Sequence, residues 1–89
     1  MKHAGADALN ALADLLEEIR AYEGLREPKR GTFYHRSSAF LHFHEDPAGF
    51  FADLKIGDMF QRFPVNTVAQ RRVLLRRIAR LTRDHRRPS

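Results

Sequence analysis

Residues 40–56, FLHFHEDPAGFFADLKI, decide the fold, because they place two stretches of alternating polarity on either side of a turn sequence. Alternation with a period of two is typical of β-strands that bury one face. Within the turn sequence DPAG, Pro47 presets one backbone dihedral angle and Gly49 accepts a positive one. The stretch therefore predicts an antiparallel hairpin with a four-residue turn.

The turn length also predicts which residues of the two strands lie opposite each other. The predicted pairs are Glu45 with Phe50, His44 with Phe51, Phe43 with Ala52, His42 with Asp53, Leu41 with Leu54, and Phe40 with Lys55. Together with the strand before the hairpin, the alternation gives two faces. The apolar face contains Tyr34, Leu41, Phe43, Ala52, Leu54 and Ile56. The mixed face contains Phe33, His35, Phe40, His42, His44, Phe51, Asp53 and Lys55.

Strand-like segments continue on both sides of the hairpin. Residues 32–36, TFYHR, and 59–63, MFQRF, are rich in aromatic side chains and alternate in polarity, so we expect a meander of three to four antiparallel strands. The connection at Ser37 and Ser38 lacks the Gly or Asn that a two-residue turn favours. A one-residue slip at this connection would move His35 to the apolar face.

A helix is predicted before the strands, from about residue 8 to 23. Asp7 can cap it and Gly24 can end it. Its apolar positions recur with helical spacing at Leu9, Leu12, Leu16 and Ile19. The next segment, GLREPKRG at residues 24–31, has no apolar periodicity and predicts a connecting loop.

A second helix is predicted after the strands, from about residue 68 to 84, with Thr67 as its cap. Two amphipathic helices need an apolar sheet face to bury their stripes, so both should cover the apolar face. The expected fold class is α+β: an N-terminal helix, an antiparallel meander of three to four strands and a C-terminal helix. With 89 residues, the chain should form one domain, residues 1–89.

Composition and motifs exclude several classes of protein. The sequence has no Cys, which excludes disulfides, thiolate zinc sites and cysteine nucleophiles. Asp7 and Asp14 interrupt the N-terminal apolar stretch, and no segment reaches membrane-spanning length, so we expect a soluble cytoplasmic protein. His42 and Asp53 resemble part of a catalytic triad, but no nucleophile motif or phosphate loop is present. We expect neither an enzyme nor a cofactor.

The net charge of +5 is unevenly distributed along the chain. Residues 67–89 contain eight arginines and one acid, a net charge of +7, whereas residues 1–66 have a net charge of −2. The second helix places arginines on one side at Arg72, Arg76, Arg80, Arg83 and Arg87. They could bind nucleic acid, or they could complement the acidic first helix.

The histidines of the mixed face suggest a metal site. An HxH sequence on a strand places both imidazoles on the same face. The candidate ligands are His35, His42, His44 and Asp53. The alternative is an ordinary cross-strand pair between His42 and Asp53, with the other histidines in solvent.

The same face could instead be covered by a second copy of the chain. Exposed aromatic patches usually mark association, and a two-fold homodimer would bury the aromatic side chains. The candidate association face consists of Phe33, Phe40, His42, His44 and Phe51. We expect this small, non-enzymatic interaction domain to self-associate.

The run GTFYHRSSAFLHFHEDPAGFFADLKIGDMFQRFPV also carries a resemblance, which covers residues 31 to about 81. It is similar to the centre of a group of short bacterial proteins that have a helix before and after the same strand-rich segment. The resemblance implies a compact α+β fold in the bacterial cytosol. It implies no activity, cofactor or catalytic residue.

Overall fold

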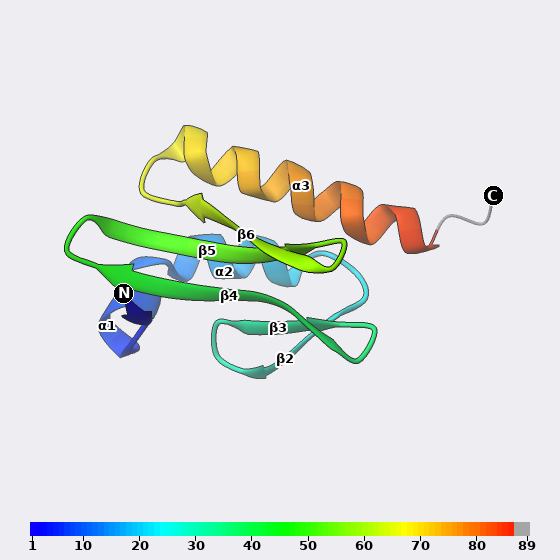
Figure 1. Cartoon of the computed structure of the whole chain (residues 1–89), viewed down its shortest axis with the longest axis horizontal. Helices are drawn as coiled ribbons and strands as arrows, with labels where there is room; N and C mark the ends of the chain where they lie inside the picture. Colours follow the sequence, from blue (N-terminus) through cyan, green and yellow to red (C-terminus); the bar gives the residue numbers. More distant parts are fainter. Residues whose placement is uncertain (87–89) are drawn as a thin grey trace.

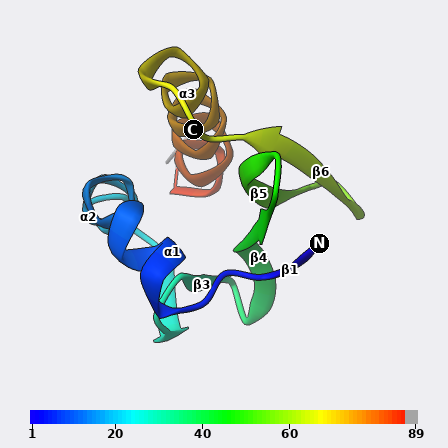
Figure 2. The same ribbon diagram turned by 90° about the vertical axis from the view of Figure 1, so that its left-hand side faces the viewer.

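The computed structural model describes the backbone of residues 1–86 and the side chains of residues 1–83. In chain order, its elements are β1 (Lys2–His3), α1 (Ala6–Ala11), α2 (Ala13–Arg20), β2 (Leu25–Lys29), β3 (Thr32–His35), β4 (Ser38–Asp46), β5 (Gly49–Ile56), β6 (Met59–Pro64) and α3 (Val68–Arg86). The fold is α+β, as the sequence predicts. The described chain has more strands than expected, because β2 (Figure 1) and β1 (Figure 2) join the predicted meander.

The central hairpin has the predicted register. β4 and β5 pair antiparallel, from Leu41 opposite Leu54 to Glu45 opposite Phe50, and Asp46 pairs with Gly49 across the turn. The sheet order is β2-β3-β4-β5-β6, and the nine-residue β4 has room for two partners along one edge. Its first half pairs with β3 and its second half pairs with β1. The N-terminal strand is thereby placed next to the second histidine of the HxH sequence.

The hairpin between β3 and β4 differs from the prediction. Its two turn residues are Arg36 and Ser37, both with positive φ. An irregularity then makes Phe33 face Leu41 while Tyr34 faces Ala39, which leaves Phe40 as an extra residue in β4. Such a bulge changes the face that the following side chains occupy.

The bulge overturns four face assignments. Phe33 and Phe40 were predicted on the mixed face, but they are 1% and 5% exposed and belong to the hydrophobic core. His35 was also predicted on the mixed face, but it follows Phe33 by two residues in β3 and its ring packs on Phe40. Tyr34 was predicted on the apolar face, but it pairs with Arg26 of β2 and lies under that guanidinium. The cause of all four errors is the single extra residue, because one position along a strand reverses every side chain.

The N-terminal helix is divided in two. The break lies at Leu12, whose φ of −99° and ψ of 11° leave the helical range. Gly5 is the N-cap and Asp7 lies inside the first turn, so the predicted cap at Asp7 is wrong. An acidic side chain in the first turn still complements the positive end of the helix dipole.

The C-terminal helix begins where the sequence predicts. The backbone N–H of Gln70 donates to Thr67 Oγ1 at 3.1 Å, and Gln70 Oε1 accepts from the N–H groups of Asn66 and Thr67. This reciprocal arrangement is a capping box, which satisfies donors that the first turn leaves free. The predicted position Arg87 lies outside the described residues.

All helices lie on one side of the curved sheet, and the N-terminus lies on the other side (Figure 2). The covered face and the helices form one core with fully buried side chains, among them Leu12, Leu16, Ile19, Leu41, Leu54, Leu74 and Ile78. Tyr22, just after α2, donates its hydroxyl to the backbone carbonyl of Leu75 at 3.4 Å and so joins the two helical segments. We call the side of the sheet that faces away from the helices the outer face.

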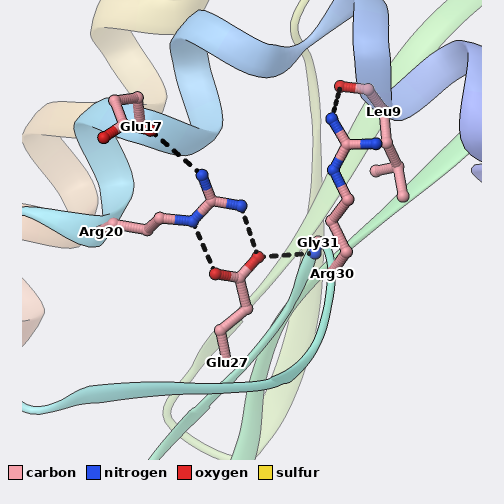
Figure 3. A network of polar contacts seen from close by, with 6 residues as sticks. All are labelled: Leu9, Glu17, Arg20, Glu27, Arg30 and Gly31. Carbon is pink, nitrogen blue, oxygen red and sulfur yellow. Dashed lines mark hydrogen bonds and ion pairs between the residues drawn. The ribbon is translucent and has the colours of Figure 1, made fainter.

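Residues 25–29 form the edge strand β2 rather than the predicted loop. Glu27 explains part of this, because its carboxylate accepts two hydrogen bonds from Arg20 of α2 and one from the N–H of Gly31 (Figure 3). Arg30 extends the link by donating to the carbonyl of Leu9. A charged network therefore holds this edge strand against the helices, and apolar periodicity alone does not reveal it.

Within residues 1–86, no helix combines the length and the apolar character that a membrane crossing requires.

Candidate metal centre

Four strands bring polar side chains together on the outer face. His42 and His44 come from β4, Asp53 from β5, Arg62 from β6 and His3 from β1. In β4, the two histidines alternate with Leu41 and Phe43 of the core. Because neighbouring residues of a strand point to opposite faces, burial of Leu41 and Phe43 places both histidines on the outer face. The cross-strand partner of His44 is His3 on one side and Phe51 on the other.

Three imidazoles converge at this point. One ring nitrogen from each of His3, His42 and His44 lies within 4.8 Å of the other two. The closest approach is 3.1 Å, between His42 Nδ1 and His44 Nε2. The ring of His3 stacks on the ring of His44 with centroids 4.9 Å apart. We call His3, His42 and His44 the three-histidine cluster.

A carboxylate borders the cluster. Asp53 Oδ2 lies 3.0 Å from His44 Nε2, and the Asp53 side chain is only 10% exposed. Arg62 donates to both carboxylate oxygens, at 2.8 and 2.9 Å. These hydrogen bonds lower the pKa of Asp53 against the opposing effect of burial, so Asp53 is ionised at neutral pH.

The carboxylate fixes the role of one ring nitrogen of His44. An ionised Asp53 can only accept, so His44 Nε2 is the donor in this contact. The other ring nitrogen, Nδ1, is buried and has no hydrogen-bond partner. Buried polar atoms normally have a hydrogen-bond partner, so His44 Nδ1 is an exception.

His42 favours its neutral form. Burial lowers its pKa, and the positive charges near it act in the same direction, while Asp53 opposes them. The ring of Phe60 lies 5.0 Å from the His42 ring and covers part of it. A neutral imidazole is the form that binds metal ions.

The predicted ligand set is only partly brought together. His42, His44 and Asp53 are adjacent, but His35 is not a member of the three-histidine cluster. His35 pairs with Ser38, which lies four residues before His42 in β4. The centroids of the His35 and Phe40 rings are 5.1 Å apart. The sequence analysis missed His3. A two-residue strand has too few positions to show a period, so its residues alone gave no signal for it.

The other predicted surfaces are distributed as follows. Of the candidate association face, His42, His44 and Phe51 lie on the outer face, whereas the aromatic rings of Phe33 and Phe40 are in the core. Two large apolar side chains of β6 are exposed instead, Met59 at 74% and Phe60 at 43%. The predicted arginine row of α3 is exposed at Arg72, Arg76, Arg80 and Arg83.

Comparisons with protein-family models, with curated proteins and with solved structures found no match to this chain. The similarity to short bacterial proteins therefore stays a prediction, and the functional argument rests on the geometry of the site.

Proposed function

We propose that this protein binds a transition metal ion at the three-histidine cluster, with Asp53 as the adjacent carboxylate. The observation that supports the proposal is the convergence of three imidazole nitrogens within 4.8 Å. Unlike charged side chains, neutral imidazoles can gather without electrostatic repulsion, and together they offer the donor set that suits zinc, copper, nickel and non-haem iron.

The distances suit a tetrahedral ion. Zinc binds imidazole nitrogen at about 2.0–2.1 Å, which places two donors of a tetrahedral site about 3.3 Å apart. His42 Nδ1 and His44 Nε2 lie 3.1 Å apart, and His44 Nε2 and Asp53 Oδ2 lie 3.0 Å apart. A bound ion would take the place of the proton on His44 Nε2, which lies between the other two atoms, so binding should release a proton.

His3 would close the site from the N-terminal side. It is exposed, whereas His42 and His44 are half-buried, and it belongs to the shortest described strand. Two hydrogen bonds hold the segment after it: the N–H of Ala4 donates to the Phe43 carbonyl and the N–H of Gly5 donates to Glu45 Oε2. His3 is therefore positioned beside the cluster, and its exposed ring would have to move toward the ion to complete the site.

Asp53 would be the fourth donor, and Arg62 would support it from outside the site. Groups that hydrogen-bond to metal ligands hold them in place, and their loss typically lowers metal affinity 10- to 100-fold. Arg62 holds the Asp53 carboxylate in place through two hydrogen bonds. The same pair has a further role at the sheet surface, since it joins β5 to β6.

Isothermal titration with Zn²⁺, together with the visible absorption of bound Co²⁺, tests the proposal. We expect one ion per chain, loss of binding in His42→Ala and His44→Ala, and at least tenfold weaker binding in His3→Ala. His35→Ala is the matched control, because it removes a half-buried imidazole of the same sheet that lies outside the cluster. Absence of Zn²⁺ and Co²⁺ binding, or equal loss in His35→Ala, would contradict the proposal.

Self-association through the outer face is a second candidate, and the exposure of Phe60 favours it. Met59, one residue earlier in β6, points to the opposite side of the sheet. A homodimer of this kind would now centre on Phe60 and Phe51 rather than on Phe33 and Phe40. Light scattering should then give twice the monomer mass, and Phe60→Asp should give a monomer. A dimer that dissociates in EDTA would instead show that the metal ion joins the two copies. Both candidates fit the cytosolic setting expected for a chain without Cys.

A further inference from the structure

Helix α3 has two chemically distinct sides. Its inner side packs Leu74, Ile78 and Thr82 into the core. Its solvent-facing side, which is not part of the outer face of the sheet, carries four exposed arginines, Arg72, Arg76, Arg80 and Arg83, which we call the arginine row. Their spacing of four, four and three residues keeps them on one side of the helix.

Among residues 1–83, no ion pair joins an arginine of the row to an acidic side chain. Glu17 of the acidic α2 pairs with Arg20 instead. Like charges on one helix repel each other, and a polyanion would relieve that repulsion.

We propose that the arginine row binds the sugar–phosphate backbone of a double-stranded nucleic acid. Arg72 and Arg83 are eleven residues apart, which corresponds to about 16 Å along a helix. A duplex carries one charge per about 1.7 Å of its axis, so roughly ten phosphates occupy this length. Phosphates on the far side of the duplex are out of reach, but the near side still offers about as many phosphates as the row has arginines.

The side chains around the row favour a duplex over a single strand. Single-strand sites combine positive charge with aromatic rings on which unpaired bases stack. The open depression beside the row has a volume of about 520 Å³ and is lined by Val73, Arg76, Arg77, Ala79, Arg80 and Arg83. Its described lining consists of guanidinium groups and aliphatic side chains without an aromatic ring, so these residues can contact phosphates but offer no stacking surface.

A membrane surface fits less well than a duplex. Basic amphipathic helices bind membranes by inserting an apolar face between lipids. In α3 that face is already used, because Leu74 and Ile78 are fully buried in the core. The exposed part offers charge with only isolated aliphatic side chains, such as Val68 and Val73.

The arginine row and the three-histidine cluster are independent. α3 lies on the covered side of the sheet, whereas the N-terminus with His3 lies on the other side (Figure 2). The duplex proposal therefore does not rest on metal binding, and EDTA should leave duplex affinity unchanged.

Fluorescence anisotropy with a labelled 20-base-pair DNA duplex, measured from 25 to 200 mM NaCl, tests the proposal. With four phosphate contacts, log K should fall with log salt with a slope of about −4, and Arg76→Gln with Arg80→Gln should reduce the magnitude of the slope by about 2. The control is Lys29→Gln with Arg36→Asn, which removes two exposed charges elsewhere. The control should keep the wild-type slope.

Three outcomes would overturn the proposal. The first is no duplex binding at 25 mM NaCl. The second is an equal loss of slope in the control, which would indicate only a general effect of net charge. The third is tighter binding to single-stranded DNA of the same length, or to phosphatidylserine vesicles, than to the duplex. Circular dichroism of each variant confirms that the folded state is being compared.

Discussion

The two faces of the β4–β5 hairpin are built from the same strands but perform different tasks. On the covered face, Leu41, Ala52 and Leu54 are fully buried among apolar neighbours. On the outer face, one residue further along each strand, His42 and Asp53 take part in a polar network. The covered face supplies burial energy, and we expect substitutions on the outer face to affect folding less.

The largest predicted effect is on the covered face. Leu54→Asp should unfold the domain, at a cost of about 4 kcal/mol or more, because it buries a charge without a partner. Lys55→Asp, the adjacent residue on the outer face, should cost less than about 1 kcal/mol. Urea titration followed by circular dichroism measures both, and similar midpoints for the two variants would contradict the assignment of the faces.

The next effect separates two phenylalanines that belong to different faces. Phe40→Ala should lose about 3 to 4 kcal/mol, because Phe40 is 5% exposed and its removal leaves a cavity in the core. Phe60→Ala should lose about 1 kcal/mol or less, because Phe60 is 43% exposed. Thermal unfolding compares them. A Phe40→Ala variant as stable as Phe60→Ala would show that the bulge does not turn Phe40 inward.

A smaller effect depends on pH and concerns the network that joins β2 to the helices. The hydrogen bonds from Arg20 hold the pKa of Glu27 below its ordinary value of 4.5. Because the folded-state pKa is the lower one, Glu27 stabilises the fold above the unfolded-state pKa, and this contribution is lost as pH falls through the folded-state pKa.

Glu27→Gln should remove this contribution. At pH 7 the variant should be about 1 kcal/mol less stable than wild type, since the pair is partly exposed to solvent. Between pH 5 and pH 3 the free energies of unfolding of the two proteins should converge. Urea titrations at several pH values give the difference, and a constant difference over this range would refute the role of Glu27.

The smallest effect is predicted for the three-histidine cluster itself. In the presence of EDTA, His42→Ala should change the free energy of unfolding by less than about 1 kcal/mol, because it removes a partly exposed side chain from a polar surface. Adding Zn²⁺ should raise the melting temperature of wild type but not of this variant. A large loss of stability in EDTA would show that the outer face also supports the fold.

The difference between the two hairpins explains how much the sequence could predict. The DPAG turn has one strongly preferred geometry, so the register of β4 and β5, and the neighbourhood of His42 and Asp53, follow from it. The connection after His35 has neither Gly nor Asn, yet Arg36 and Ser37 both adopt positive φ. Side-chain periodicity cannot locate such a turn or the bulge near it.

The candidate metal centre could be predicted from the sequence only in part, for the same reason. Two of its histidines and Asp53 could be placed from one reliable turn. The third histidine depends on β1, which pairs with β4 through tertiary contacts that no local pattern announces. β2 was missed for a related reason: its position depends on the ion pair between Glu27 and Arg20, which are seven residues apart and belong to different elements.

The two edges of the sheet have one feature in common. β2 contains Pro28 and an irregular register, and β6 ends at Pro64 beyond the charged Arg62. A proline lacks the N–H that a new strand would need, and a charge on an edge opposes stacking of sheets. The sheet therefore resists lengthening by strand addition from another molecule. In a crowded cell, such edges lower the tendency of the chain to form fibres, and they direct any specific contact to its faces.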